Sequence, residues 1–206
     1  SDTNKAFVVD IAWSLVIMIA GFVLALSHPV TVYSSYVLLL LAFWGLRLAI
    51  FLFATRILTG IEDTRYDAIS SQWSGSKIWG FFLHYQLQAL LALLIALPFY
   101  WVPLVNDFNV VRVVILAIIV ALILSEWISD RQLYRFQQSH SKGVCQVGFW
   151  TWCRHPNCFF EGNIWVFFCL SCLSTSAMSS IFSVISPIVI HWIMVKITIP
   201  ITEKNF

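Results

Sequence analysis

Long apolar stretches recur along the whole chain, separated by shorter polar segments. Each is close to the roughly 20 residues that a helix needs to cross the hydrocarbon of a bilayer. Runs such as Val37–Phe43 and Val113–Leu124 lack the alternation typical of a membrane β-barrel strand. The predicted fold is therefore an all-α, polytopic transmembrane helical bundle that forms a single transmembrane domain over residues 1–206. The six predicted spans are Ala6–Leu26, Tyr36–Ile57, Ile78–Val105, Val111–Ile128, Asn163–Ser176 and Ile181–Ile199.

Composition and charge place the chain in a membrane and orient it there. Hydrophobic residues make up 60% and charged residues 11% of the 206 residues, whereas soluble domains carry about 45–50% and about 25%. Lys and Arg gather in alternate connections, so the positive-inside rule predicts that both termini and two long basic loops face the cytosol of a bacterial inner membrane or the endoplasmic reticulum. A net charge of +2 without a basic stripe indicates membrane lipids rather than nucleic acid as surroundings. The basic residues of these loops are Arg56, Arg65, Lys77, Arg131, Arg135, Lys142 and Arg154.

The second basic loop, predicted over Ser129–Glu161, is the longest polar stretch of the chain. Its aromatic residues are typical of a segment that lies at the membrane interface or re-enters the bilayer. It also holds Cys145, Cys153 and Cys158, which a reducing cytosol keeps as thiols. Their spacing matches no zinc pattern, so no metal site is predicted.

One charge lies near the middle of a predicted span. An ionisable group there costs about 2.5–3.5 kcal/mol on insertion scales, and Arg47 is too central to reach either interface. Trp44 lies three residues earlier and shares its helix face. Two interpretations follow: Arg47 belongs to a ligand site inside the bundle, or it forms a structural ion pair with another helix.

A second polar group lies at the predicted end of the fourth span. Glu126 and Asp130 are spaced i and i+4, so both carboxylates lie on one face. Carboxylates at a helix C-terminus oppose the macrodipole. This favours a role in binding a ligand or in pairing with nearby arginines over a role in capping.

The third group is the run Arg154-His155-Pro156-Asn157 with Glu161 behind it. Pro156 restricts His155 to extended geometry and can open a helix, on which Asn157 and Glu161 fall one turn apart. Arg154 and His155 then precede a helix N-terminus, where anions bind well. The array indicates a phosphate or carboxylate ligand at the membrane surface.

The weakest signal lies in the third span. His84 and Gln88 are spaced i and i+4, with Tyr85 between them. Such residues line a cavity, donate a proton or bridge helices by hydrogen bonds, and the three alternatives stay open.

Several segments, in order along the chain, resemble those of the DUF1295 membrane proteins, a group related to the steroid 5α-reductases and sterol reductases. The segment around Arg154 resembles the signature W-x-x-S-R-H-P-N-Y-x-G-E. R-H-P alone is also found in isoprenylcysteine and phospholipid methyltransferases. The segments that carry the resemblance are Asp10-x2-Trp13, Arg47-Leu48, Arg56, Glu62-Asp63-x-Arg65-Tyr66, Ser129-Asp130-x-Gln132-x3-Phe136, Trp150-x3-Arg154-His155-Pro156-Asn157-x3-Glu161 and Pro200-x2-Glu203.

The resemblance implies an NADPH-dependent reductase that delivers hydride to a carbon–carbon double bond in a lipid or steroid-like enone. The implied cofactor site is a helical bundle open to the cytosol, where arginines hold phosphate and Asp and Asn hold ribose or the nicotinamide amide. Tyr85 and Glu161 are the candidates for the catalytic proton donor. The cofactor-binding candidates are Arg47, Asp130, Arg135, Arg154, His155 and Asn157.

Departures from the pattern keep two alternatives in view. Cys153, Cys158 and Phe160 stand where the signature has Ser, Tyr and Gly. Trp44 stands roughly where the steroid reductases use a Tyr to polarise the substrate carbonyl. The chain ends at Phe206, where family members continue with a Tyr-rich cytosolic tail, so that tail is expected to be absent. The alternatives are a non-catalytic, truncated lipid-binding relative and an S-adenosylmethionine-dependent methyltransferase of isoprenylcysteine or phospholipid type.

Overall fold

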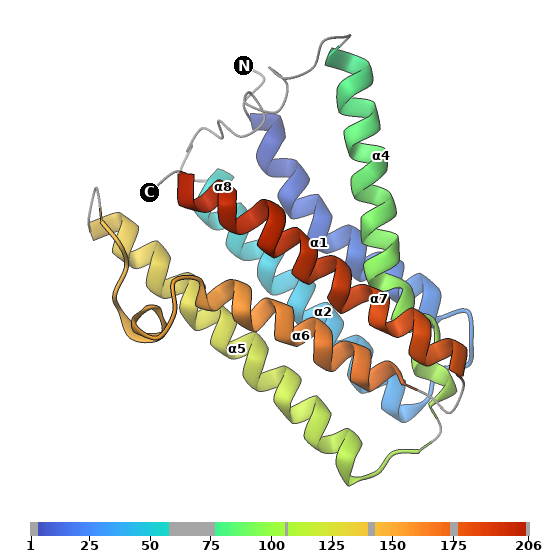
Figure 1. Ribbon diagram of the computed structural model, residues 1–206. Coiled ribbons are helices and arrows are strands. Elements are labelled where there is room, and N and C mark those ends of the chain that lie inside the picture. Colours follow the sequence, from blue (N-terminus) through green and yellow to red (C-terminus); the bar gives the residue numbers. More distant parts are fainter. Residues whose placement is uncertain (1–3, 58–76, 106, 140–142, 174–176, 205–206) are drawn as a thin grey trace.

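The computed structural model describes residues 4–57, 77–105, 107–139, 143–173 and 177–204 (Figure 1). Every regular element in this part of the chain is a helix, which confirms the predicted all-α class. The predicted segment Glu62–Tyr66 lies outside the described residues. The elements are α1 (Asn4–Ala25), α2 (Val32–Leu52), a π-helical turn η1 (Phe53–Ile57), α4 (Lys77–Ala96), the 3₁₀ turns η2 (Leu97–Tyr100) and η3 (Val102–Leu104), α5 (Val110–Ser139), a 3₁₀ turn η4 (Gly148–Thr151), α6 (Pro156–Cys172), α7 (Ala177–Ile193), a π-helical turn η5 (Met194–Thr198) and α8 (Ile199–Lys204).

Helix lengths and hydropathy are those of a membrane protein. Each of the six predicted stretches is helical over most of its described length. A shorter apolar helix, Ile11–Ala25, lies within α1. The four segments long and apolar enough to cross a bilayer are Val32–Thr55, Trp79–Leu104, Val110–Ser139 and Ser180–Glu203.

The prediction of a loop over Ser129–Glu161 is wrong at both of its ends. Helix α5 continues to Ser139, and α6 already begins at Pro156. The polar residues that follow Ile128 mark a change of surroundings rather than the end of the helix, because Arg and Gln are good helix formers. Glu126 and Asp130 therefore lie well before the last turn of α5, and the argument from the macrodipole does not apply to them.

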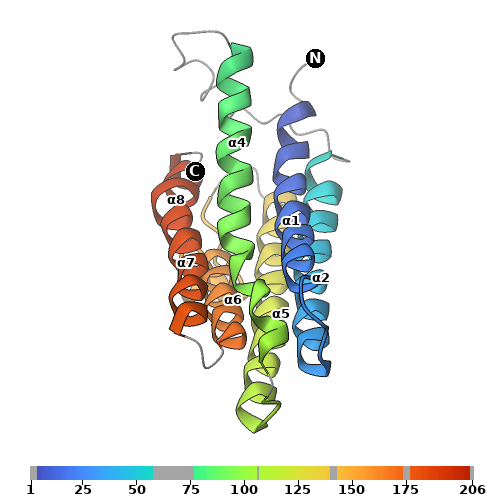
Figure 2. The ribbon, with the colours of Figure 1, turned by 90° about the vertical axis from the view of Figure 1, so that its right-hand side faces the viewer.

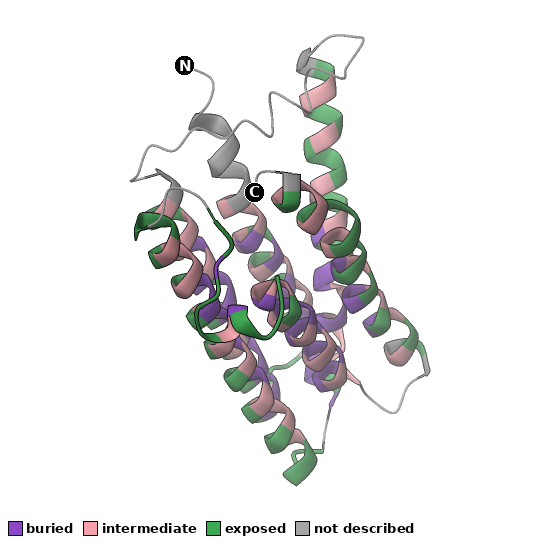
Figure 3. Cartoon of the chain, turned by 60° about the vertical axis from the view of Figure 1, so that its left-hand side comes forward, coloured by how far each residue is buried: buried purple, intermediate pink, exposed green. Residues whose placement is uncertain are grey.

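The helices pack side by side around one apolar core (Figures 1 and 2). Helix α6 lies between α5 and α7, while α1 packs against α2 and α4. Buried residues gather on the faces that meet inside the bundle, and exposed residues cover the outer faces (Figure 3). Tightly packed aromatic and branched side chains fill the centre. The largest of them are Trp44, Trp165, Tyr33, Phe99, Phe168, Ile17 and Leu41.

Local signals explain two of the helix starts. Thr31 precedes α2 and its hydroxyl accepts a hydrogen bond from the amide of Ser34, while the Ser34 hydroxyl accepts one from the amide of Thr31. This reciprocal pattern satisfies amide groups that the first helical turn leaves free. Pro156 is the first residue of α6, as its fixed φ and missing amide hydrogen favour.

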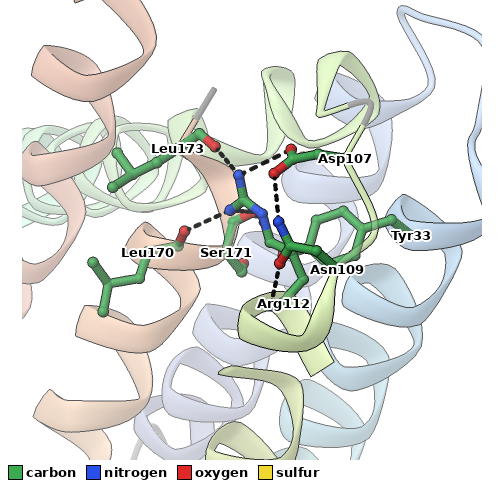
Figure 4. A network of polar contacts seen from close by, with 7 residues as sticks. All are labelled: Tyr33, Asp107, Asn109, Arg112, Leu170, Ser171 and Leu173. Atoms are coloured by element: carbon green, nitrogen blue, oxygen red, sulfur yellow. Dashed lines mark hydrogen bonds and ion pairs between the residues drawn. The ribbon is translucent and has the colours of Figure 1, made fainter. Parts of the chain in front are cut away.

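The opposite end of α6 is held by a polar network shown in Figure 4. Arg112 of α5 donates to the carbonyl oxygens of Leu173 at 2.7 Å and Leu170 at 3.1 Å. The Tyr33 hydroxyl donates to the carbonyl of Ser171 at 2.9 Å, and the Arg112 guanidinium lies 5.5 Å from the centre of the Tyr33 ring. A cation at the C-terminal carbonyls of a helix matches both their need for donors and the macrodipole. The network ties α2, α5 and α6 together at this end of the bundle.

The other end of the bundle holds most of the segments in which the sequence predicted site residues. The beginning of α1, the end of α5, the beginning of α6 and the end of α8 all lie at this end (Figures 1 and 2). The beginning of α1 and the end of α8 thus lie at the same end of the bundle.

Candidate functional site

Arg47 forms the centre of a buried polar cluster between α2 and α5. Its Nη2 lies 2.6 Å from Oε2 of Glu126, and its Nη1 donates to Oδ2 of Asp130 at 2.9 Å. The three residues are only 8%, 4% and 9% exposed. The prediction that Arg47 points into the bundle toward these carboxylates is confirmed. Its ion pairs neutralise a charge that would otherwise be very costly at this depth.

Glu161 of α6 adds a third carboxyl group, and two indole groups hold it. Trp44 donates its Nε1–H to Oε2 at 2.8 Å, and Trp165 donates to Oε1 at 2.9 Å. Both tryptophans are almost fully buried, and their rings pack edge to face with centroids 4.9 Å apart. Trp44 and Trp165 therefore fix the orientation of the Glu161 carboxyl group.

Asn157 and Arg47 carry polar atoms that still lack a partner. Asn157, one turn before Glu161 on α6, lies within hydrogen-bonding reach of the Asp130 carboxylate. Within the described part of the chain, Oδ1 of Asn157 and Nε of Arg47 are buried without a hydrogen bond. Nη2 of Arg47 pairs with Glu126 by charge, but its alignment is not that of a hydrogen bond. Buried polar atoms are rarely left unpaired, so these are the atoms of the cluster that remain able to bind a polar group of a ligand.

The charges of the cluster do not balance among the described residues. One guanidinium faces the carboxyl groups of Glu126, Asp130 and Glu161. An unpaired buried charge is costly, so a carboxyl group here is suited to carry a proton or to bind a donor from a ligand. Such an excess of buried carboxyl groups is common where proteins perform acid–base chemistry.

Arg154 and His155 lie nearer the surface, at the beginning of α6. Nη1 of Arg154 is 3.5 Å from Oε1 of Glu203 in α8, and Nε2 of His155 is 3.3 Å from the same oxygen. The side chains of Arg154 and Glu203 are 72% and 42% exposed. A pair this exposed contributes only about 0–1 kcal/mol, so Arg154 is available to an anion. The two family-like segments around Arg154 and Glu203 thus meet in space.

Two of the predicted site residues lie outside the cluster. Arg135 is exposed on α5, just over one turn beyond Asp130, and faces the same end of the bundle. Tyr85 lies on α4, is 38% exposed and stacks on Phe81 with centroids 6.1 Å apart. Helix α4 packs mainly on α1 and α7, and none of its described residues before Ala92 is buried. Tyr85 therefore lies apart from Glu161, the other candidate donor.

His84 and Gln88 form a local pair on the same helix. Nε2 of Gln88 lies 3.0 Å from Nε2 of His84. This contact lies within α4.

Cys158 stands beside the cluster, where the family signature has Tyr. Its side chain is only partly exposed, so reagents reach it less readily than the exposed Cys153.

Trp165 is the one buried contact of the site that the sequence did not predict. It lies four residues after Glu161 on α6, so its indole can reach the carboxylate along one helix face. That spacing was the available signal, but a Trp in an apolar stretch is usually a packing residue.

Comparisons with known proteins give one match. The model of a protein family described as a protein of unknown function, DUF1295, matches residues 1–206. No curated protein matches the chain, and neither does any solved structure.

Proposed function

Because the chain belongs to the DUF1295 family, we propose that it is a membrane reductase that uses NADPH to saturate a carbon–carbon double bond in a lipid or steroid-like enone. The observation that carries the proposal is convergence. Residues from three family-like segments far apart in sequence meet in one buried cluster on α2, α5 and α6. They are Arg47, Asp130, Asn157 and Glu161.

The available polar groups fit such a cofactor. The unpaired Oδ1 of Asn157 is an acceptor that suits a carboxamide N–H. Asp130 suits a ribose hydroxyl. Phosphates do not fit the carboxylate-rich cluster itself. They fit the exposed cation nearer the surface, Arg154, together with His155.

The chain's own residues would hold the carboxyl groups in position, neutralise their charge and protonate the substrate. When bound, NADPH supplies a hydride to one carbon of the double bond. Arg47 holds the carboxyl groups of Glu126 and Asp130 in place, and both oxygens of Glu161 are fixed by indole donors. Glu161 therefore acts as a positioning acceptor. Because one cation faces three carboxyl groups, one of these groups would be held protonated, and it would give that proton to the other carbon of the double bond.

The arrangement in the membrane is part of the same proposal. We take α1, α2, α4, α5, α6 and α7 as six crossings, with the end that holds Arg154 in the cytosol, where NADPH is found. The excess of Lys and Arg in the connections at this end supports that orientation. Helix α4 leaves Tyr85 accessible, which suits a lipid substrate arriving from the bilayer side.

Calorimetric titration of the purified protein in detergent with NADPH, NADH and S-adenosylmethionine tests the proposal. One charge-assisted hydrogen bond contributes about 1.5–3 kcal/mol. NADPH should therefore bind roughly 10- to 100-fold more tightly than NADH. Arg154→Gln should remove most of that preference, whereas Lys196→Gln, an exposed cation on η5, should leave it unchanged.

The rival functions give different outcomes. Binding of S-adenosylmethionine without NADPH would favour a methyltransferase. A non-catalytic lipid-binding relative would bind none of the three ligands. The ion pairs of Arg47 favour the non-catalytic relative over the methyltransferase, because they leave that guanidinium little free charge for a ligand.

A further inference from the structure

A shallow groove opens where α5 meets the segment that precedes α6. Its volume is about 450 Å³, within the range typical of small-molecule sites. Helix α5 forms one wall and the turn η4 with its flanks forms the other. The groove is lined by Ile128, Gln132, Gly148, Phe149, Thr151 and Trp152.

Hydrogen bonds hold the two walls of the groove in place. Gln132 accepts from the backbone N–H of Phe149 at 3.1 Å, and Trp150 donates its indole N–H to the carbonyl of Ser129 at 2.9 Å. Trp150 is buried, but Trp152 is 82% exposed and lies edge-on to Phe149. The groove is therefore a fixed feature with an exposed aromatic rim.

An apolar stripe on α5 leads into the groove. Val120, Leu124 and Ile128 follow one another at i+4 spacing and are 37%, 39% and 46% exposed, so they line one face. Trp127 lies at the end of this stretch, directly before Ile128, and a Trp at the end of an apolar run is typical of the membrane interface. The groove therefore lies at the level where acyl chains meet headgroups.

Two exposed cations lie beside the groove on the same helix. Arg131 and Arg135 follow Ile128 by three and seven residues, so they share its side of α5. The Arg131 guanidinium lies 4.8 Å from the centre of the Trp127 ring. Neither arginine forms an ion pair with a carboxylate in the part of the chain that the structure describes, so both are open to an outside anion.

We propose that this groove binds one anionic phospholipid. An acyl chain lies along the Val120–Ile128 stripe and in the groove, and the headgroup phosphate contacts Arg131 and Arg135. An apolar channel that ends at two unpaired cations matches a lipid with a negatively charged headgroup. The proposal does not depend on the reductase activity, because the groove lies on the outer face of α5 and the buried cluster lies inside the bundle.

Native mass spectrometry of the detergent-purified protein tests this site. The probes are phosphatidylglycerol, phosphatidylcholine with the same acyl chains, and glycerol phosphate, which has no acyl chain. One phosphatidylglycerol should bind in clear preference to phosphatidylcholine. Each basic residue near an anionic headgroup contributes about 1 kcal/mol, which corresponds to about fivefold in affinity. Changing both arginines to Gln should therefore lower phosphatidylglycerol binding roughly 25-fold.

Matched variants separate the groove from general charge attraction. Lys196→Gln removes an exposed cation from η5 and should leave the preference intact. Trp152→Ala should weaken both phospholipids alike, because it removes apolar rim surface and no charge. Equal binding of the two phospholipids would overturn the proposal. Competition by glycerol phosphate, or an equal loss in Lys196→Gln, would overturn it as well.

Discussion

Arg47 shows how one costly residue organises its surroundings. Inside a span its charge needs a counter-charge, and the i, i+4 spacing of Glu126 and Asp130 supplies two on one face of α5. Both residues and their pairing follow from the sequence, because few groups in an apolar bundle can neutralise an arginine. The position of Glu161, which accepts a hydrogen bond from Trp44, does not follow, since it depends on how α6 lies relative to α2.

Because carboxyl groups outnumber cations in the cluster, removing the cation should destabilise the protein more than removing one carboxyl group. Arg47→Met should destabilise the protein by about 3–5 kcal/mol, because it leaves buried carboxylates without their cation. Glu126→Gln keeps the shape, removes one of the surplus carboxyl groups and leaves Arg47 paired with Asp130, so it should cost less than about 1 kcal/mol. Unfolding of both variants in detergent, followed by tryptophan fluorescence, measures the difference. An equal loss would contradict the unbalanced cluster.

The indole of Trp165 gives a second prediction at this scale. Trp165→Phe keeps an aromatic ring but removes the N–H that Oε1 of Glu161 accepts. A buried acceptor left unpaired costs about 1–3 kcal/mol. Trp192→Phe is the control, because Trp192 is 54% exposed. If the two variants unfold at the same denaturant concentration, the indole serves only to pack.

At the scale of the elements, α6 determines the geometry of the site. Pro156 starts it, Asn157 and Glu161 project from its first turns, and Arg112 holds its far end. The start is predictable from Pro156, but the Arg112 contacts are not. Arg112 binds the backbone carbonyl groups at the end of α6. Every residue has such a carbonyl, so the sequence does not show where this helix ends or which carbonyls are free.

Gly162 allows α6 to lie close against α7. A Cβ at this position would meet Nε2 of His191 at 2.9 Å, and that ring is held by its contact with the carbonyl of Pro187 at 2.7 Å. Gly162→Ala should therefore push α6 away from α7 and destabilise the protein by about 1–3 kcal/mol, as overpacking does.

Gly45→Ala is the matched comparison for Gly162→Ala. Its Cβ would meet Met18, whose nearest side-chain atoms lie at 3.0 to 3.4 Å, and a flexible thioether adapts more readily than a held imidazole. Thermal unfolding of the two variants in the same detergent should give the lower midpoint for Gly162→Ala. The reverse order would show that His191 is free to move.

At the scale of the whole molecule, the sequence predicts the class of fold better than the extent of its helices. Hydropathy reports the solvent around a residue, so it located the apolar stretches but missed the last turns of α5 and the first of α6. The convergence of Arg47, Asp130 and Asn157 was predicted through the family resemblance. Tyr85 was grouped with Glu161 by chemistry alone, and α4 packs on another side of the bundle.

Orientation in the membrane is testable with the cysteines the chain already has. Cys153 is exposed in the segment before α6, whereas Cys145, Cys169 and Cys172 are buried. Cys158 is only partly exposed, in the first turn of α6. A membrane-impermeant maleimide, which reacts with thiolate, should therefore label Cys153 alone, and Cys153→Ser should abolish the labelling.

The side from which Cys153 reacts decides the topology. If the Arg154 end faces the cytosol, intact cells should remain unlabelled and inverted membrane vesicles should be labelled at neutral pH. Labelling of Cys153 in intact cells would place the Arg154 end outside, away from cytosolic NADPH. It would then remove the proposed cofactor supply while leaving the fold untouched.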